Sequence, residues 1–372
     1  MGLRSLNGNS IGKALVLTCF GESHGAYIGA VIDGCPAGLP LSEADIQVEL
    51  DKRRPGLSEI TSPRMEEDKV EIISGVYKGY TSGAPICMVI RNRDVDSGPY
   101  EHYVIRPRPG HADYTARVKY GDFNDPRGGG RFSGRVTAAY VMAGAIAKKL
   151  LSLIGVEVLA HTVQIGCVRV DREVSYDEIR RNVYMNPIRC AVPEVAERMV
   201  EEILRAAGEG DSVGGIVEGI ALNVPVGLGE PIFDSLDADM AKMLFNIPAV
   251  KGVEFGAGFR VASMRGSEAN DQYAIRDGKI ITLTNNAGGI VGGISNGMPI
   301  KVRVAFKPTP SISKRQRTVN LETMSEEEIQ IAGRHDPCIV PRAVPVVEAC
   351  LAFVLADHAL RAGKIPRVIK SF

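Results

Sequence analysis

The sequence has no tryptophan, no excess of either charge and no cysteine motif of the kind that binds zinc. Lysine plus arginine and aspartate plus glutamate each number 44, so the chain lacks the net basic charge that drives binding to nucleic acids. Its seven cysteines are odd in number and have no CxxC spacing, which is typical of reduced thiols in a cytosolic protein. These absences argue against a nucleic-acid partner and predict no metal site.

Long apolar runs are also missing, since no stretch is seen to reach the ~18 to 20 residues needed to span a bilayer. We therefore expect a cytoplasmic protein with no membrane contact. Glycine and proline, by contrast, are plentiful at 41 and 21 residues, which indicates many shaped loops. The 372 residues are 45% hydrophobic and show no linker, so we interpret residues 1–372 as a single domain with a large core.

A run of three glycines, 128–130, stands before the apolar segment 138–147, which predicts a buried helix. Glycines can expose consecutive backbone N–H groups, and Arg131 and Arg135, expected one helical turn apart, would add positive charge at the helix N-terminus. The segment predicts a phosphate site, the alternative being a glycine loop that enters an ordinary core helix. It matches neither GxxxxGK[ST] nor GxGxxG.

The pentapeptide 21–25, Gly-Glu-Ser-His-Gly, matches the G-x-S-x-G motif of α/β hydrolases, in which a helix must follow the serine. Strand-like residues 26–33 follow instead, so a serine hydrolase built on Ser23 is the weaker alternative. His24 has a glycine or serine on either side of it in this motif and could reach a ligand, or could be a turn histidine bonded to the backbone. A second histidine, His111, lies in a proline-stiffened loop beside arginines at 106–114.

Hydrophobic periodicity and capping residues predict the following further elements. We expect helices at 42–50, 138–153, 193–207, 237–245 and 341–362, a short helix capped by Ser325 to Glu328, a helix start at 175–178, and strands at 14–20, 26–33, 70–73, 84–90, 215–226 and 298–306. Segments 38–46 and 230–240 share a proline, an apolar pair and an acidic helix start, which suggests an internal pseudo-twofold repeat. The glycine-rich segment 285–297 suits close approach of the backbone to a flat ligand.

Three motifs together resemble those of the chorismate synthase family: GESHG at 21–25, RGGGR-x-S-x-R at 127–135 and GRHDPC-x-x-PRAVPVVEA at 333–349. Further matches in between extend the resemblance over nearly the whole chain. It implies an α+β fold with long central helices between two antiparallel sheets, and a homotetramer. The implied reaction is 1,4-anti elimination of phosphate from 5-enolpyruvylshikimate 3-phosphate to give chorismate, the last common step toward aromatic amino acids, with reduced FMN (FMNH2) as cofactor.

The resemblance also implies roles for individual residues. His24 would be the acid at the phosphate, His111 the acid that protonates the reduced flavin, and Asp336 a participant in proton removal. The implied substrate-binding residues are Ser23, Arg53, Arg54, Arg108, Arg135 and Arg342. The implied cofactor-binding residues are Arg53, Arg131, Phe132, Ser133, Pro248, Ala249, Gly292, Lys307, Pro308, Thr309, Pro310, Ser311 and Arg334.

The chain departs from the family pattern at several places. Phe132, Gly134 and Val136 replace a serine, an alanine and a glutamate, and Pro248, Pro310 and Glu59 stand where asparagine, serine and arginine are common. Two further alternatives are a flavin oxidoreductase with net hydride transfer and a non-catalytic binder of a phosphorylated ligand. NADPH would be required only if the enzyme reduced its own flavin, for which no nicotinamide motif is found.

Overall fold

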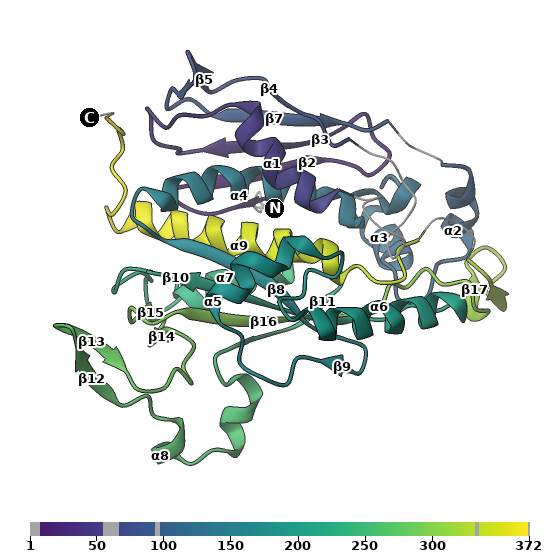
Figure 1. Cartoon of the computed structure of the whole chain (residues 1–372). Helices are drawn as coiled ribbons and strands as arrows, with labels where there is room; N and C mark the ends of the chain where they lie inside the picture. The colour runs from purple at the N-terminus through teal and green to yellow at the C-terminus, as the bar shows by residue number, and fades with distance from the viewer. Residues whose placement is uncertain (1–7, 55–66, 94–96, 332–334, 371–372) are drawn as a thin grey trace.

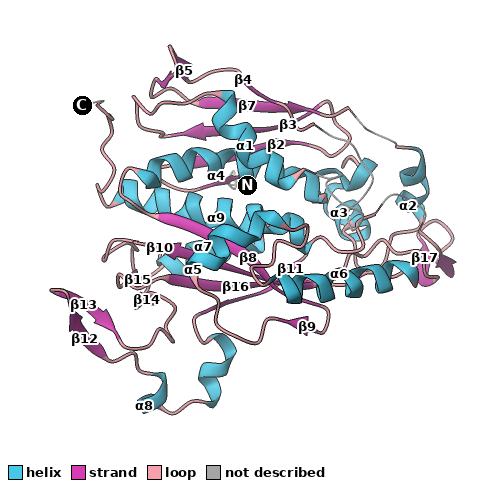
Figure 2. Cartoon of the chain, in the orientation of Figure 1, coloured by secondary structure: helices cyan, strands magenta, loops and turns pink. Residues whose placement is uncertain are grey.

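The computed structural model describes residues 8–54, 67–93, 97–331 and 335–370. Its centre is a pair of packed helices, α4 (Thr137–Ser152) and α9 (Val340–Arg361), which lie between two five-stranded sheets (Figure 1, Figure 2). All strand pairs within the two sheets are antiparallel. The expected α+β architecture, with long helices between antiparallel sheets, is therefore confirmed.

The two sheets each turn one face to the helices. The first has the spatial order β1 (Ser10–Ile11), β2 (Val16–Gly21), β3 (Tyr27–Asp33), β7 (Ile86–Arg91), β4 (Val70–Ile72); the second has the order β11 (Val250–Phe255), β16 (Ile300–Phe306), β10 (Gly215–Leu222), β8 (Glu157–Ile165), β9 (Val168–Arg169). In β16 the residues Ile300, Val302 and Val304 are buried, while Lys301 and Arg303 between them are partly exposed. Such period-two alternation gives a strand one apolar face, and this face covers the helices.

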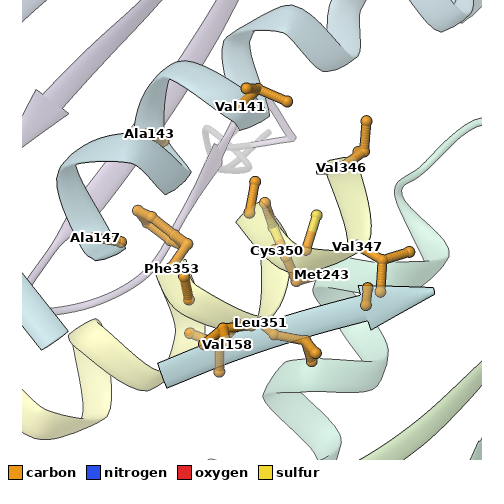
Figure 3. Packing of buried hydrophobic residues seen from close by; sticks show 14 of the residues in the cluster. Val141, Ala143, Ala147, Val158, Met243, Val346, Val347, Cys350, Leu351 and Phe353 are labelled. Carbon is orange, nitrogen blue, oxygen red and sulfur yellow. The ribbon is translucent and has the colours of Figure 1, made fainter. Parts of the chain in front are cut away.

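Helix α9 is mostly apolar and is buried along most of its length, because protein surrounds it. Figure 3 shows side chains of α9, among them Leu351 and Phe353, gathered with side chains of neighbouring elements such as Val141 and Val158. By length and composition α9 could cross a membrane, yet its most apolar window is 100% buried inside the protein. The expectation that no apolar stretch reaches spanning length was thus wrong, and the segment is a core helix.

Helix α1 (Glu43–Arg53) begins at the predicted capping box, in which the Ser42 backbone N–H donates to Asp45 Oδ2 at 2.8 Å. Segments 38–46 and 230–240, which look alike in sequence, each lead into a helix with an acidic first turn, α1 and α7 (Leu236–Phe245). The remaining helices are α2 (Glu101–Ile105), α3 (Asp113–Tyr120), α5 (Tyr176–Asn182), α6 (Pro193–Gly208) and α8 (Gly266–Ala269). The remaining strands form the pairs β5 (Val76–Tyr77) with β6 (Tyr80–Thr81), β12 (Tyr273–Arg276) with β13 (Lys279–Thr282), β14 (Ile290–Val291) with β15 (Ile294–Ser295), and β17 (Gln316–Asn320) with β18 (Ser325–Ile329).

Strand β18 corrects one prediction. The Ser325 to Glu328 pattern predicts a capped short helix, but the segment is a strand that pairs with β17, and Thr318 lies opposite Glu327. A capping box stabilises a helix only where apolar residues follow at helical spacing, and here Ile329 and Ile331 alternate with the exposed Gln330, a period of two that suits a strand.

Candidate active site

A cavity of about 690 Å³ is formed by loops that are far apart in the sequence. Its walls come from the β2–β3 loop, the end of α1, the loop before α3, the glycine loop before α4, the α7–β11 loop, the segment after β16 and the start of α9. The predicted site residues that line it are Ser23, His24, Arg53, Arg108, His111, Arg131, Phe132, Ser133, Arg135, Pro248, Ala249, Lys307, Thr309, Pro310, Ser311, Asp336 and Arg342. All three residues predicted to be catalytic therefore share one cavity.

The glycine loop packs between the two predicted acid histidines. Gly128 and Gly129 have φ of +60° and +81°. A Cβ on Gly128 would lie 2.3 Å from His24 Cδ2, and one on Gly129 would lie 3.1 Å from His111 Nε2. These positions need glycine both for backbone conformation and for space, and the loop thereby sets the positions of both imidazoles.

The loop is not, however, the first turn of the buried helix. A 3-10 turn, Gly134–Val136, separates it from α4, so Arg131 and Arg135 do not lie one helical turn apart on one face. Arg131 donates to the backbone carbonyls of Cys19 and Gly21 in β2, both at 3.1 Å. The prediction of two neighbouring arginines at a helix N-terminus was wrong in this respect, although both arginines line the cavity.

His111 is held by Asp113 at the start of α3. Its Nδ1 lies 2.7 Å from Asp113 Oδ1, and since a carboxylate only accepts, Nδ1–H is the donor and Nε2 is the ring nitrogen near Gly129. Arg108 donates to the same carboxylate from Nε and Nη2, both at 2.8 Å. Burial would raise the pKa of Asp113, but the hydrogen bonds and charges of Arg108 and His111 outweigh it and hold the pKa well below its usual value.

His24 and Ser23 lie side by side at the turn between β2 and β3. His24 is buried, its Nδ1 lies 2.9 Å from Ser97 Oγ, and its ring meets Tyr100 edge-on at 5.3 Å between centroids. The Ser23 hydroxyl is also buried and has no hydrogen-bond partner among the described residues. A buried hydroxyl without a protein partner in a cavity wall is suited to a bound ligand.

Two buried arginines share one carboxylate. Arg53 at the end of α1 donates from Nη1 to Asp68 Oδ2 at 3.1 Å, and Arg135 Nη1 donates to the other oxygen, Asp68 Oδ1. Nearby, Arg342 at the start of α9 donates from Nη1 to Asp336 Oδ2 at 2.5 Å and from Nε to the Arg53 carbonyl at 3.3 Å. The end of α1 and the start of α9 are thus joined through their arginines.

The segment after β16 forms another wall. Lys307 Nζ donates to the Gly110 carbonyl, which ties this segment to the loop that carries His111. Burial lowers the pKa of Lys307, and the nearby charge of Lys251, which also lines the cavity, lowers it further. Thr309 Oγ1 is buried and, among the described residues, has no hydrogen-bond partner.

Three predicted residues lie elsewhere, and one cannot be placed. Arg54 is partly exposed and pairs with Asp51 at 3.5 Å; it is the C-cap residue, at which the chain leaves the helix, whereas Arg53 in the last helical turn is buried. Gly292 is in the β14–β15 turn and Pro308 does not line the cavity. Segment 285–297 was expected to approach a flat ligand closely. The close approach seen at Gly288 is to another part of the backbone, since a Cβ on Gly288 would lie 2.4 Å from the Gly256 nitrogen. Arg334 lies outside the described residues.

The sequence interpretation missed several residues of the site. Tyr100, His335 and Lys251 line the cavity, while Asp68 and Asp113 hold its cations. Asp113 could have been found, because it lies two residues after His111 in the loop that was singled out. Asp68 lies in a stretch without a recognisable motif and carried no such signal.

The geometry does not support the hydrolase alternative. Ser23 lies between two antiparallel strands rather than before a helix, and the His24 Nδ1 faces Ser97. The cavity is lined by five arginines and two lysines against one acidic residue among the described residues, which defines an enzyme site for a small polyanion.

Comparisons with known proteins identify the family. The family model described as chorismate synthase matches residues 15–360. A chorismate synthase of Dehalococcoides mccartyi is 56% identical over 97% of this chain and 99% of its own length. One of Korarchaeum cryptofilum is 58% identical over 96% of this chain and 98% of its own length. A crystal structure of chorismate synthase matches with a TM-score of 0.75 and 34% identity over 95% of this chain and 93% of that chain.

The chain belongs to the chorismate synthase family. It is a carbon–oxygen lyase that eliminates phosphate from 5-enolpyruvylshikimate 3-phosphate to give chorismate, and a reduced flavin is the family's cofactor. The fold comparison agrees with this assignment, and nothing in the comparisons supports a serine hydrolase.

Proposed function

We propose that the 690 Å³ cavity binds reduced FMN together with the substrate, and that His24, His111 and Asp336 handle the protons of the elimination. The observation that carries this proposal is that both imidazoles pack against the glycine loop, within a cavity lined by five arginines among the described residues. Reduced FMN, when bound, supplies an electron-rich ring beside the substrate without net oxidation or reduction.

The arginines would bind the substrate anions. The substrate has one phosphate and two carboxylates, and guanidinium groups bind both kinds of anion through paired N–H donors. Arg53, Arg108, Arg135 and Arg342 reach the cavity from four different segments, so they can surround a small molecule instead of gripping one end of it. The Ser23 hydroxyl, next to His24 and without a hydrogen-bond partner in the described part of the chain, would orient the substrate.

The protons would move at defined nitrogen and oxygen atoms. His24 is proposed to protonate the phosphate as the carbon–oxygen bond breaks, because a protonated phosphate is the better leaving group and an imidazole with a pKa near ~6.5 can supply the proton. His111, whose Nδ1–H faces Asp113, would hold its transferable proton on Nε2 toward the flavin. Asp336, fixed by Arg342, would take part in removing the C6 proton.

The residues near Lys307 fit a flavin phosphate and ring edge. The pKa of Lys307 is lowered by burial and then by the nearby charge of Lys251, and an anion bound beside Lys307 would relieve this effect. The buried Thr309 hydroxyl is without a partner among the described residues, and Ser311 Oγ accepts from Arg108 Nη1 at 3.3 Å. Ala249 takes a φ of +75°, which turns its backbone at the cavity wall.

A cytoplasmic homotetramer is the proposed assembly. The β12–β13 hairpin extends away from the second sheet (Figure 1) and exposes Tyr273, Ile275 and Ile280, which are 71%, 80% and 71% exposed. Apolar side chains in such numbers on a projecting hairpin suit contact between subunits. Light scattering should give a mass near four times 39.9 kDa, whereas a monomer mass would contradict the proposal.

Replacement of His111 tests the proposed chemistry. His111→Ala should reduce kcat roughly 100-fold or more, as is typical when a general acid is removed, with flavin supplied in the reduced state. His102→Ala is the matched control, because His102 is exposed in α2 and does not line the cavity. Unchanged kcat in His111→Ala would contradict the assigned role and favour a site that only binds its ligand.

A further inference from the structure

We propose that Asp68 is the positioning residue that holds Arg53 and Arg135 as a pair facing the substrate. The proposal depends on the assignment of these two arginines to substrate binding. Asp68 does not line the cavity, whereas both arginines do, so it would act through them and not by contact with the ligand.

The contacts of Asp68 divide its two oxygens between the two arginines. Oδ2 accepts from Arg53 Nη1 at 3.1 Å and Oδ1 accepts from Arg135 Nη1, and the Asp68 side chain is 0% exposed. Arg53 is oriented further by Thr137 Oγ1 at 2.9 Å, and Arg135 by Asn92 Oδ1 at 2.9 Å. Arg53 Nη2 also donates to the Gly134 carbonyl at 2.8 Å and to the Arg135 carbonyl at 3.4 Å. Both guanidinium groups are therefore held by fixed protein acceptors at the cavity wall.

The charges explain why a carboxylate is needed there. The pKa of Arg53 is lowered to about 9, chiefly by burial; the charges of Asp68 and Asp336 raise it, while the neighbouring charges of Arg342 and Arg135 help to lower it. Guanidinium groups crowded in this way repel each other unless an anion lies between them. One carboxylate between two arginines prevents the repulsion and still leaves one positive charge for the substrate.

The backbone presents this carboxylate in a fixed position. Asp68 has a φ of +48°, in the left-handed region that aspartate tolerates better than most residues. Gln47 of α1 bonds the backbone at and after this residue, donating from Nε2 to the Asp68 carbonyl at 3.4 Å and accepting from the Val70 N–H at 3.1 Å. The same helix that ends in Arg53 thus holds the residue that orients Arg53.

Asp68→Asn is the direct test. The amide oxygen can accept from one guanidinium, but its NH₂ group would face the other, so only one arginine would remain held. We expect the KM for 5-enolpyruvylshikimate 3-phosphate to rise about tenfold or more at saturating reduced FMN, while kcat changes by less than about threefold. The thermal midpoint should also fall, since a buried charge pair is broken.

Glu348→Gln is the matched control for lost stability. Glu348 in α9 is equally buried, pairs with Lys148 at 2.7 Å and accepts from Tyr184 at 3.0 Å, and it does not line the cavity. It should lower the thermal midpoint without raising KM. An equal rise of KM in both variants, or a wild-type KM in Asp68→Asn, would overturn the proposal.

Arg135→Gln separates failure of this inference from failure of the proposed site. If Arg135→Gln keeps the wild-type KM, the assignment of Arg135 to substrate is wrong; if it raises KM and Asp68→Asn does not, only the Asp68 role is wrong. If Asp68→Asn does not fold, the double variant Asp68→Asn with Arg135→Gln is tested instead, because it removes the repulsion between the two guanidinium groups and is expected to fold. Its KM should lie within about threefold of the KM of Arg135→Gln alone. A further tenfold rise in the double variant would show that Asp68 does not act through the pair.

Discussion

Carboxylates placed behind cations are the recurring feature at the scale of single residues. Asp113 holds Arg108 and His111, Asp336 holds Arg342, and Asp68 holds Arg53 and Arg135. Each acid fixes the orientation of a group that lines the cavity, and a chain with no net charge thereby builds a strongly basic site. The positive charge of the cavity is therefore local, and it depends on where each carboxylate–cation pair lies in the fold.

Asp113 makes a prediction about stability and pH. Its pKa is held below the usual value of ~3.9, so its contribution to the free energy of unfolding is present above that pH and is lost as the pH falls through the lowered pKa. Asp113→Asn should therefore cost about 2 to 4 kcal/mol at pH 7, and the difference from the wild type should shrink below pH ~4. Urea unfolding between pH 3 and 7 measures this, and a difference that does not depend on pH would contradict the pairing.

The two arginines at the end of α1 show what sequence alone could resolve at this scale. Both Arg53 and Arg54 were candidates because both precede a proline-glycine turn at a helix end. Only the way in which α1 packs on the rest of the protein determines that the Arg53 side chain is buried and the Arg54 side chain is partly exposed. Asp68 was missed for the same reason, since its partners lie 15 and 67 residues away in the sequence and are brought to it by the tertiary fold.

At the scale of elements, the contact between α4 and α9 determines how the core is built. Gly144 allows the closest approach, because a Cβ there would lie 2.3 Å from the Cβ and 2.5 Å from the Cα of Ala349. A backbone atom cannot move aside as a flexible side chain can, so even a methyl group must push the helices apart.

Gly144→Ala should therefore lower the free energy of unfolding by about 1 to 3 kcal/mol, even though alanine is the better helix former by roughly 1 kcal/mol. Gly208→Ala at the end of α6 is the control, because a Cβ there would meet nothing within 4 Å, and it should be neutral or slightly stabilising. Thermal unfolding of the two variants measures the contrast. Equal stability of both would mean that the helices do not pack as closely as described.

Local signals predicted the elements well where they were strong. Apolar runs with caps gave α1, α4, α6, α7 and α9, and alternation gave β3, β7, β10 and β16. The prediction failed at 325–328, where a capping pattern was read without the apolar face that a helix needs, and the cross-strand partner in β17 could not be seen locally. The resemblance implied two antiparallel sheets but no strand order, which only the structure shows, because pairing joins segments far apart in sequence.

At the scale of the whole molecule, the two sheets and the helix pair bring the loops together. The cavity is lined by residues from Gly8 to Val346, so almost the entire chain must fold before the site exists. Through the family resemblance, the sequence predicted which loops form the site. It could not show that Gly292, in the β14–β15 turn, does not line the cavity. The position of a residue relative to the cavity depends on long-range packing, which a short sequence motif does not specify.

The central claim is that this cavity carries out a flavin-dependent elimination without net redox change. The most direct measurement is anaerobic incubation of the protein with dithionite-reduced FMN and 5-enolpyruvylshikimate 3-phosphate, with chorismate absorbance, released phosphate and the flavin spectrum followed together. We predict chorismate and phosphate in equal amounts over many turnovers, with a transient flavin signal that returns fully to reduced FMN. No chorismate, or oxidation of one flavin per product, would contradict the account.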